Sequence, residues 1–455
     1  MAALAARRGR AALLCGCLLV IARAVPLFAD DETASTTLFP PRSESSRLWL
    51  AGQANVIMQG HGSFNAPYTG ANSLRPEAER KTSKLFTLYS TYRTSRTTEI
   101  ILDVESAGGK GISDALGLAG FSNLDVVRNP TLGATPYVAR AQIHAVIPLG
   151  GEQEHSERSF LSGFATMPAR RLELRAGKIS TVDLFDVNDA GSDSHLQFLN
   201  WTVDDNGAYD YAADTRGYTW GMTAEYHLSD WTLRGGVMLM PKVANGIRLD
   251  HDLRHARGEN VEWELRRPLI KGRTTTSRFL LYRNLARMGS YREALVMHGN
   301  DVPDITLSRR RGRTKFGAGV NLEQELSDRV RAFARLGWND GRNESFAYTE
   351  VDRTVEIGGD VRPFGRRPLD KIGIAGVING LSAPHRDYLA AGGLGFIIGD
   401  GALRYGPEEI LEAYYTAFIG RGVYLSVDAQ SVKNPAYNRD RGPVLIPSAR
   451  LHVDF

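Results

Sequence analysis

The chain has almost no cysteine and, after its first residues, no long hydrophobic run. Among 455 residues the only cysteines are Cys15 and Cys17. Beyond residue 29 no stretch approaches the roughly 18 consecutive apolar residues that indicate a membrane-spanning helix. P-loop, G-x-S-x-G and H-E-x-x-H motifs are also absent. These absences exclude a disulfide scaffold and a helical membrane protein, and they leave no recognisable enzyme signature.

The N-terminus has the composition of a secretory signal. Three arginines precede a short apolar run over residues 11–22, and small residues follow it. We predict a cleaved signal peptide over 1–29 and a mature N-terminal segment over 30–47, with cleavage after Ala24 or Ala29. A buried core helix and a lipoprotein cleavage site are the alternatives.

The basic character of the chain belongs to the predicted signal. Its four arginines and both cysteines leave on cleavage, so 55 − 4 = 51 basic residues face 51 acidic ones. A mature chain with equal numbers of basic and acidic residues gives no argument for a nucleic-acid partner. A cysteine-free exported chain must be held together by other means than disulfides.

Alternating apolar and charged residues recur along the mature chain. They occur over 137–147, 171–178, 261–266, 330–338 and 423–431. Successive side chains of a strand point to opposite faces, so each segment has one apolar and one charged face. Strands of soluble sandwiches are usually shorter, whereas a tilted strand needs about 9–11 residues to cross a bilayer. Since lipid cannot satisfy backbone polar groups, such a sheet must close on itself.

Short turns alternate with long polar stretches between these segments. Tight turns are predicted at 228–230, 326–328 and 420–422, and long stretches at 60–82, 179–217, 240–260 and 284–314. This asymmetry is typical of outer-membrane barrels, which have short periplasmic turns and long outer loops.

We therefore predict an all-β fold, a transmembrane antiparallel β-barrel over residues 48–455 with a polar lumen. The segment count favours 16 strands, with 18 as the alternative, because single-chain bacterial barrels have an even number. The last strand alternates up to Phe455. Outer-membrane proteins commonly end in this way, and the barrel assembly machinery is thought to recognise it. The prediction places the chain in the outer membrane of a Gram-negative bacterium, exported through the periplasm.

Several long sequence motifs follow one another along the chain. They include NGLSAPHRDYLAAGGLGFIIGDG at 379–401, YGPEEILEAYY at 405–415 and NPAYNRDRGP at 434–443, and shorter ones at 117–121, 185–188, 197–201, 209–214, 217–221, 338–341 and 450–452. Together they closely resemble the OprB-type carbohydrate-selective porins over most of residues 85–455. The stretches 30–80 and 240–315 lie outside the resemblance. The resemblance implies a monomer-sized sugar channel in the outer membrane with no energy source and no cofactor.

Two local motifs have competing interpretations. Glycines at 392–395 and 399–401 look like a phosphate-binding loop, but β-rich sequence lies on both sides, which favours packing and a turn. The basic run 309–313 suits a nucleic-acid patch only in a cytosolic protein. In an exported barrel it faces the lumen or lipopolysaccharide phosphates, or it is a solvated loop.

Two kinds of acidic cluster have a metal-site or a catalytic interpretation. Asp186, Asn188 and their neighbours share part of a calcium-loop pattern, but Gln197 stands where a bidentate Glu is expected, which favours a plain loop over calcium. The carboxylates at 204–205 and 250–252 invite a glycosidase interpretation, but they lie in loop-like sequence. We predict no catalytic residue, no metal and no cofactor.

The charged faces of the strands supply the candidate site. Neutral sugars need hydrogen-bond donors and acceptors at a narrow point of the pore. The predicted pore-lining residues are Arg140, Arg175, Glu262, Glu264, Arg266, Arg331, Arg335, Asp428 and Arg450. Within this set, the candidates for the narrow point are Arg175, Glu264, Arg331 and Arg335. A network that only braces the barrel wall is the alternative for each.

The sequence thus predicts passive, carbohydrate-selective diffusion of small neutral sugars. A general or oligosaccharide porin with weak selectivity is the first alternative. A barrel for adhesion or structure, or a barrel enzyme, is the alternative from another class. Expected partners are sugars, outer-membrane lipid and lipopolysaccharide, and the barrel assembly machinery through Phe455, with no nucleic acid. The sequence leaves open whether the barrel is a homotrimer or a monomer.

Overall fold

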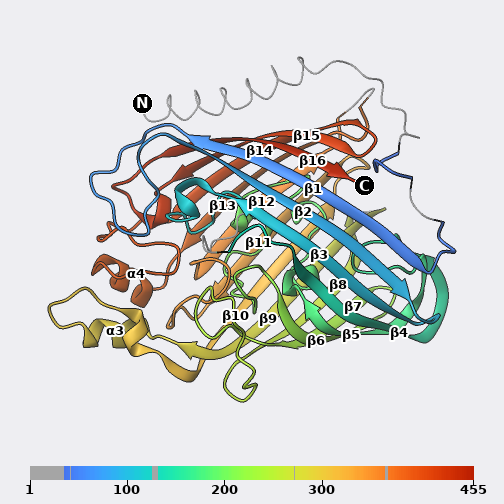
Figure 1. Ribbon diagram of the computed structural model, residues 1–455, viewed down its shortest axis with the longest axis horizontal. Helices are drawn as coiled ribbons and strands as arrows, with labels where there is room; N and C mark the ends of the chain where they lie inside the picture. The colour runs from blue at the N-terminus through green and yellow to red at the C-terminus, as the bar shows by residue number, and fades with distance from the viewer. Residues whose placement is uncertain (1–34, 41–42, 126–131, 271, 364–366) are drawn as a thin grey trace.

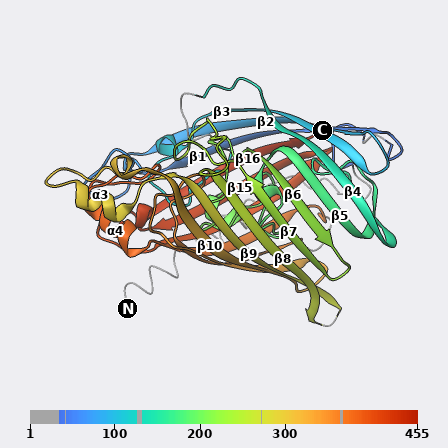
Figure 2. The same ribbon diagram turned by 90° about the horizontal axis from the view of Figure 1, so that it is seen from below.

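A computed structural model describes residues 35–40, 43–125, 132–270, 272–363 and 367–455. The predicted signal peptide lies outside these residues. Sixteen strands form one closed antiparallel barrel (Figures 1 and 2). They are β1 Leu48–His61, β2 Glu79–Arg93, β3 Thr98–Gly109, β4 Tyr137–His155, β5 Thr166–Ile179, β6 Thr219–His227, β7 Trp231–Met238, β8 Arg257–Ile270, β9 Arg273–Met288, β10 Arg310–Glu325, β11 Val330–Asn339, β12 Arg353–Val361, β13 Lys371–Gly380, β14 Glu408–Gly420, β15 Val423–Lys433 and β16 Val444–Asp454.

Short helices interrupt the connections. They are α2 Trp201–Asp204, α3 Tyr291–Met297 and α4 Ala383–Ala390, with 3-10 turns at Ile112–Asp114, Thr181–Asp183, Ile305–Ser308 and Pro435–Tyr437. Within the described part of the chain, none of the helices is both long enough and apolar enough to cross a membrane.

The barrel closes where its first and last strands meet. β1 pairs with β2 on one side and with β16 on the other, with Asn55 opposite His452. Next to this seam Phe455 exchanges backbone hydrogen bonds with Gly52, and its ring stacks on Phe86 at 5.6 Å. Closure leaves no strand edge unpaired, as a lipid-exposed sheet requires. The predicted fold is confirmed, with 16 strands and not 18.

The two faces of the wall differ as the alternation predicted. On β9, Phe279 and Leu281 point outward and are 41% and 63% exposed, whereas Tyr282 and Asn284 point inward and are 4% and 1% exposed. Outward apolar side chains are what a lipid-facing surface needs, and inward polar ones give the lumen its character.

Connections differ in length between the two ends of the barrel. One end has short turns such as 228–230, 326–329 and 421–422, as predicted. The other end carries the long connections, α3 and α4 (Figure 1).

Three of the predicted loop stretches extend into strands. The stretch 60–82 contains the ends of β1 and β2, and the actual connection is 62–78. The stretches 240–260 and 284–314 contain the ends of β8, β9 and β10 that adjoin the long connections, and the actual connections are 239–256 and 289–309. On the outward face of the β9 end, Arg283 and Arg287 flank Leu285, so arginines interrupt the apolar face. The apolar alternation therefore ends before the strands do.

Candidate functional site

The connection between β5 and β6, residues 180–218, folds into the barrel, and we call it the inward segment. The backbone N–H of Leu199 donates to the carboxylate of Glu412 on β14 at 2.6 Å. On the other side, the Tyr282 hydroxyl of β9 donates to the carbonyl of Ala208 at 2.7 Å. Strands β9 and β14 lie well apart around the barrel, so the segment crosses the lumen.

Aromatic packing anchors the inward segment. The ring of Phe198 meets Tyr414 of β14 edge-on at 4.9 Å and Phe333 of β11 at 6.0 Å. The indole of Trp201 stacks on Tyr348 with centroids 5.5 Å apart. Such pairs contribute about 0.5–1.5 kcal/mol each beyond the burial of their area, so the segment is a packed element.

The wall is shaped to receive the segment. Asn200 begins α2 by accepting the N–H of Thr202 at 3.0 Å, which is the usual role of Asn before a first helical turn. The side chain of Asn206 donates to the carbonyl of Leu336 on β11 at 3.2 Å. A side-chain carbon at Gly337 would collide with the Asn206 amide, so glycine is required for this approach.

A second connection joins the first inside the barrel. Gln59 of β1 donates to the carbonyl of Ser122 at 2.7 Å, and the Trp201 indole donates to the carbonyl of Asn123 at 2.8 Å. Residues 112–125 therefore pack between the β1 wall and the inward segment, and the two connections narrow the lumen together.

Opposite charges alternate on the inner wall from β4 to β10, and we call this array the charge ladder. Its members are Arg140, Glu173, Arg175, Glu225, Arg234, Glu262, Glu264, Arg278 and Glu323. Arg234 and Arg278 each lie 3.1 Å from Glu264, and Arg278 also lies 3.5 Å from Glu323. Charge-assisted contacts of this kind fix long side chains in place, so the ladder is a rigid polar surface.

The predicted pore-lining residues fall into three groups. Those in the charge ladder are Arg140, Arg175, Glu262 and Glu264. Those buried against the inward segment or near it are Arg335, Asp428 and Arg450. Those with partly exposed side chains, at 31% and 23%, are Arg266 and Arg331. The four residues predicted for the narrow point are therefore divided among all three groups.

Arg335 binds the inward segment and is fully buried. Its guanidinium donates to the Val203 carbonyl at 2.9 Å and to the Ser192 hydroxyl at 2.6 Å, and it lies 3.1 Å from Asp186. On the wall it lies 3.3 Å from Glu356 of β12. This side chain joins the segment to the wall, as the bracing alternative describes.

Arg450 does the same from β16. It donates to the carbonyls of Ser194 and Gln197 at 2.7 and 2.9 Å, and only 1% of the residue is exposed. Asp428 lies on the neighbouring strand β15, is 5% exposed and accepts from Gln430 at 3.4 Å.

The inward segment also carries polar side chains that the sequence analysis did not select. Asp183 accepts from Nε and Nη2 of Arg140 at 2.7 and 2.6 Å. Asp189 is exposed, and its backbone N–H donates to Glu323 at 3.2 Å. His195 lies 3.3 Å from Asp125. Loop residues follow no two-residue alternation, and the only signal for them was the polar stretch 179–217 with its 185–188 motif.

Buried carboxyl groups change the electrostatics of the inward segment. Burial raises the pKa of Asp205 to about 7, although Arg335 partly opposes this shift. Burial and the neighbouring Asp205 also raise the pKa of Asp204. Burial opposes ionisation of Asp193 too, but Lys371 and His195 outweigh it and lower the pKa. Some carboxyl groups of the segment therefore hold a proton near neutral pH.

The family is decided by a match to a family model. The model described as carbohydrate-selective porin, OprB family, matches residues 140–455, which is well over half of the chain. The chain belongs to the OprB family of carbohydrate-selective porins. The resemblance found in the sequence is thereby confirmed, and an outer-membrane location follows for this porin.

A solved OprB structure has the same fold as this porin. A high-pH structure of Pseudomonas putida OprB has a TM-score of 0.67 at 14% identity, covering 90% of this chain and 94% of that one. The outer-membrane channel DcaP of Acinetobacter baumannii scores 0.49 at 11% identity, covering 90% and 97%. A triple mutant of Rhodopseudomonas blastica porin scores 0.42 at 10% identity, covering 90% and 100%. No curated protein matches the chain.

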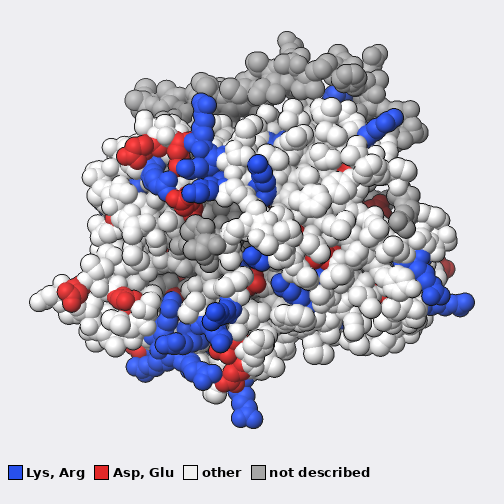
Figure 3. All heavy atoms as spheres, viewed as in Figure 1, with Lys and Arg blue, Asp and Glu red and all other residues white. Residues whose placement is uncertain are grey.

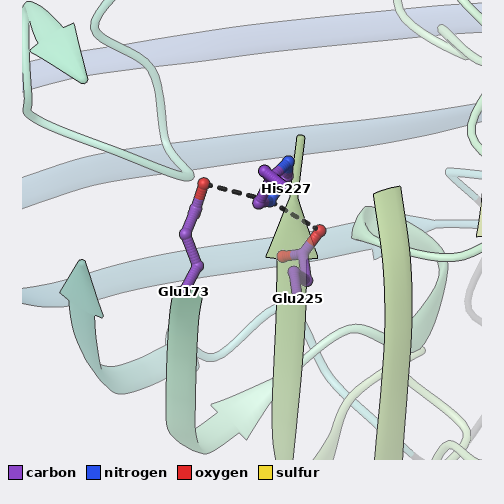
Figure 4. A group of neighbouring side chains, drawn as sticks. All are labelled: Glu173, Glu225 and His227. Carbon is purple, nitrogen blue, oxygen red and sulfur yellow. Dashed lines mark ion pairs between the residues drawn. The ribbon is translucent and has the colours of Figure 1, made fainter. Parts of the chain in front are cut away.

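One group of side chains in the porin has the composition of a metal site. Among the described residues, Glu173, Glu225 and His227 bring three ligand atoms close together (Figure 4). His227 Nε2 lies 3.2 Å from Glu173 and 3.7 Å from Glu225. Arg171 lies 2.6 Å from Glu173, and Arg234 lies 3.1 Å from Glu225. Guanidinium groups already neutralise both carboxylates, so the group fits the charge ladder better than a cation.

Proposed function

We propose that this OprB-family porin lets small neutral sugars diffuse passively between the inward segment and the charge ladder. The observation that carries the proposal is that two partly exposed donors, Arg266 and Arg331, border the buried, paired charges of the ladder. Sugar hydroxyls both donate and accept hydrogen bonds, so such donors can replace part of a sugar's hydration shell. Passive diffusion needs neither an energy source nor a cofactor.

The composition of the ladder supports a neutral solute. Four arginines and five glutamates alternate along it, so neither sign of charge dominates. A wall of one sign would attract oppositely charged ions and repel the others. A nearly balanced wall discriminates by hydrogen bonding and shape.

We place the narrow point near Arg331, Glu323 and Asp189. Arg331 has a partly exposed side chain and pairs with Asp360 at 2.9 Å on the neighbouring strand. The inward segment approaches the same wall where the Asp189 N–H reaches Glu323. Arg266 is the other partly exposed predicted residue, and we expect it to contribute from β8.

Liposome swelling with purified, refolded protein tests the function. We expect glucose to enter faster than amino acids of similar size. Amino acids carry charged groups, and a ladder of nearly balanced charge does not offset the cost of removing water from them. Equal rates would leave a general or oligosaccharide porin. Folded barrels that produce no swelling would contradict the channel and favour an adhesion or structural barrel, or a barrel enzyme.

An Arg331→Ala variant tests the proposed narrow point. It removes a guanidinium with five donors from the accessible wall, so we expect glucose entry to change at least about twofold relative to size-matched amino acids. Arg267→Ala is the matched control, because Arg267 lies at the end of β8 with 70% of its side chain exposed. An unchanged ratio in folded Arg331→Ala barrels would remove Arg331 from the site.

We further propose that the long connections face the cell exterior and the short turns face the periplasm. The asymmetry of loop length supports this orientation, since bacterial barrels have short periplasmic turns. The inward segment then narrows the lumen from the outer side.

A further inference from the structure

Exposed or half-exposed arginines gather at the ends of β8, β9 and β10 and in the connection that precedes β8, and we call this group the basic rim. Its members are Arg254, Arg257, Arg283, Arg287, Arg310 and Arg311. Figure 3 shows basic side chains gathered over this part of the surface, beside α3. None of the rim arginines was among the predicted pore-lining residues, and the proposed sugar pathway does not use them.

The basic rim lies directly above the lipid-facing surface. On β9 the outward positions are Phe279 and Leu281, followed by Arg283, the partly buried Leu285 and Arg287. Two residues of a strand span about 7 Å, so Arg283 lies one such step beyond the exposed Leu281. Pairing places Arg283 opposite Phe316 of β10, which is 43% exposed. The arginines therefore begin where the apolar band ends.

Arg283 and Arg287 do not face the lumen. Tyr282 and Asn284 alternate with Arg283 along β9 and point inward, where they are buried. On β10, Lys315 takes the inward position and contacts Asp210 of the inward segment at 3.1 Å. Arg283 and Arg287 are thus on the outer surface of the barrel, at the height of the membrane boundary.

Acidic partners neutralise only part of the rim. Arg257 and Arg283 share Glu259, each with a 2.6 Å contact. Arg311 lies 2.9 Å from Asp252, and Arg310 lies 3.1 Å from Glu293. Six arginines against these three carboxylates leave a net charge of 6 − 3 = +3 on the rim.

We infer that the basic rim binds the phosphate groups of outer-leaflet lipopolysaccharide. The inference rests on the proposed orientation, which places the rim at the outer leaflet. Arginine matches phosphate with a planar fork of donors, and a cationic cluster at a membrane boundary attracts anionic headgroups. The lipid-facing residues below the rim provide an apolar surface for the acyl chains of the same lipid.

Binding of diphosphorylated lipid A to the full barrel in detergent tests the inference, with retained lipid counted by native mass spectrometry. The test variant is Arg283→Gln/Arg287→Gln/Arg311→Gln. Each surface arginine strengthens binding about fivefold, so we expect the triple variant to lose about a hundredfold in affinity. Chemically dephosphorylated lipid A should bind wild type as weakly as intact lipid A binds the variant.

The control is Arg267→Gln/Arg273→Gln, which removes two arginines from the opposite ends of β8 and β9. It should bind lipid A like wild type. Equal retention of lipid A by wild type and the triple variant, or equal affinity for the dephosphorylated lipid, would overturn the inference. Sugar-dependent swelling by the triple variant should match wild type, so failure of the rim and failure of the sugar channel are separate results.

Discussion

At the scale of single residues, Arg335 shows why a lumen arginine need not touch the solute. Its alternation pattern is the same as that of Arg331, four residues earlier on β11. The difference is what lies over it, because the inward segment buries Arg335 completely and leaves 23% of the Arg331 side chain exposed. Strand periodicity gives the face of a residue, and only the path of the loop decides its accessibility.

Replacing Arg335 should loosen the inward segment. An Arg335→Ala variant leaves Asp186 and Glu356 without their cation, and breaking a buried pair costs about 3–5 kcal/mol. We expect single-channel currents in planar bilayers to become noisier and larger, because the segment no longer holds one position. Arg331→Ala is the comparison, since it should change solute preference with little added noise. Quiet, wild-type-sized currents from Arg335→Ala would contradict the role as an anchor.

At the scale of elements, the inward segment is the part of the molecule that the sequence predicted least well. Its polar composition correctly indicated a long connection, and the motifs at 185–188, 197–201 and 209–214 correctly indicated the family. Its path into the lumen depends on contacts with distant strands, such as Leu199 with Glu412 and Ala208 with Tyr282. No local pattern carries that information, whereas strand alternation is local and gave the barrel directly.

The prediction of where β8, β9 and β10 end was wrong for a related reason. Arg283, Arg287 and Arg310 are in strands, but they lie above the apolar band, so their sequence looks like a loop. Alternation reports a strand only where its two faces meet different surroundings. Beyond the lipid the outward face of β9 carries arginines and its inward face buries Ala286 and Met288, so the alternation of apolar outward and polar inward residues disappears.

The inward segment should be held less firmly as pH rises. The folded-state pKa of Asp205 is raised from 3.8 to about 7 by burial, with Asp186 and Asp183 adding to the shift and Arg335 opposing it. The contribution of Asp205 to the stability of the folded inward segment is therefore complete below about pH 4 and is lost as pH rises through about 7. We expect current noise to increase between pH 5 and pH 8 with a midpoint near 7.

An Asp205→Asn variant separates this group from the others in the segment. The amide cannot ionise, so the rise in noise near pH 7 should disappear while the current at pH 5 stays close to that of wild type. Asp204 has its own raised pKa and is the neighbour whose charge could produce the same effect. A pH response that survives unchanged in Asp205→Asn would assign it to Asp204 or to another group.

At the scale of the whole molecule, one orientation in the membrane underlies the roles proposed for the long connections, the inward segment and the basic rim. The long connections surround the entrance where α3 and α4 lie, and the rim meets the lipid at the same end. If the barrel were inverted, the rim would lie in the periplasmic leaflet, away from lipopolysaccharide. Orientation is therefore the global property on which the lipid inference depends.

The near absence of cysteine allows a direct test of orientation. Cys15 and Cys17 both lie in the predicted signal, so a mature chain would carry a single thiol after one substitution. Asn300→Cys places it in the exposed 289–309 connection, and Ser229→Cys places it in the exposed turn between β6 and β7. A polyethylene-glycol maleimide too large for the channel should label Asn300→Cys on intact cells and label Ser229→Cys only after lysis. Labelling of Ser229→Cys alone on intact cells would reverse the orientation and, with it, the placement of the basic rim.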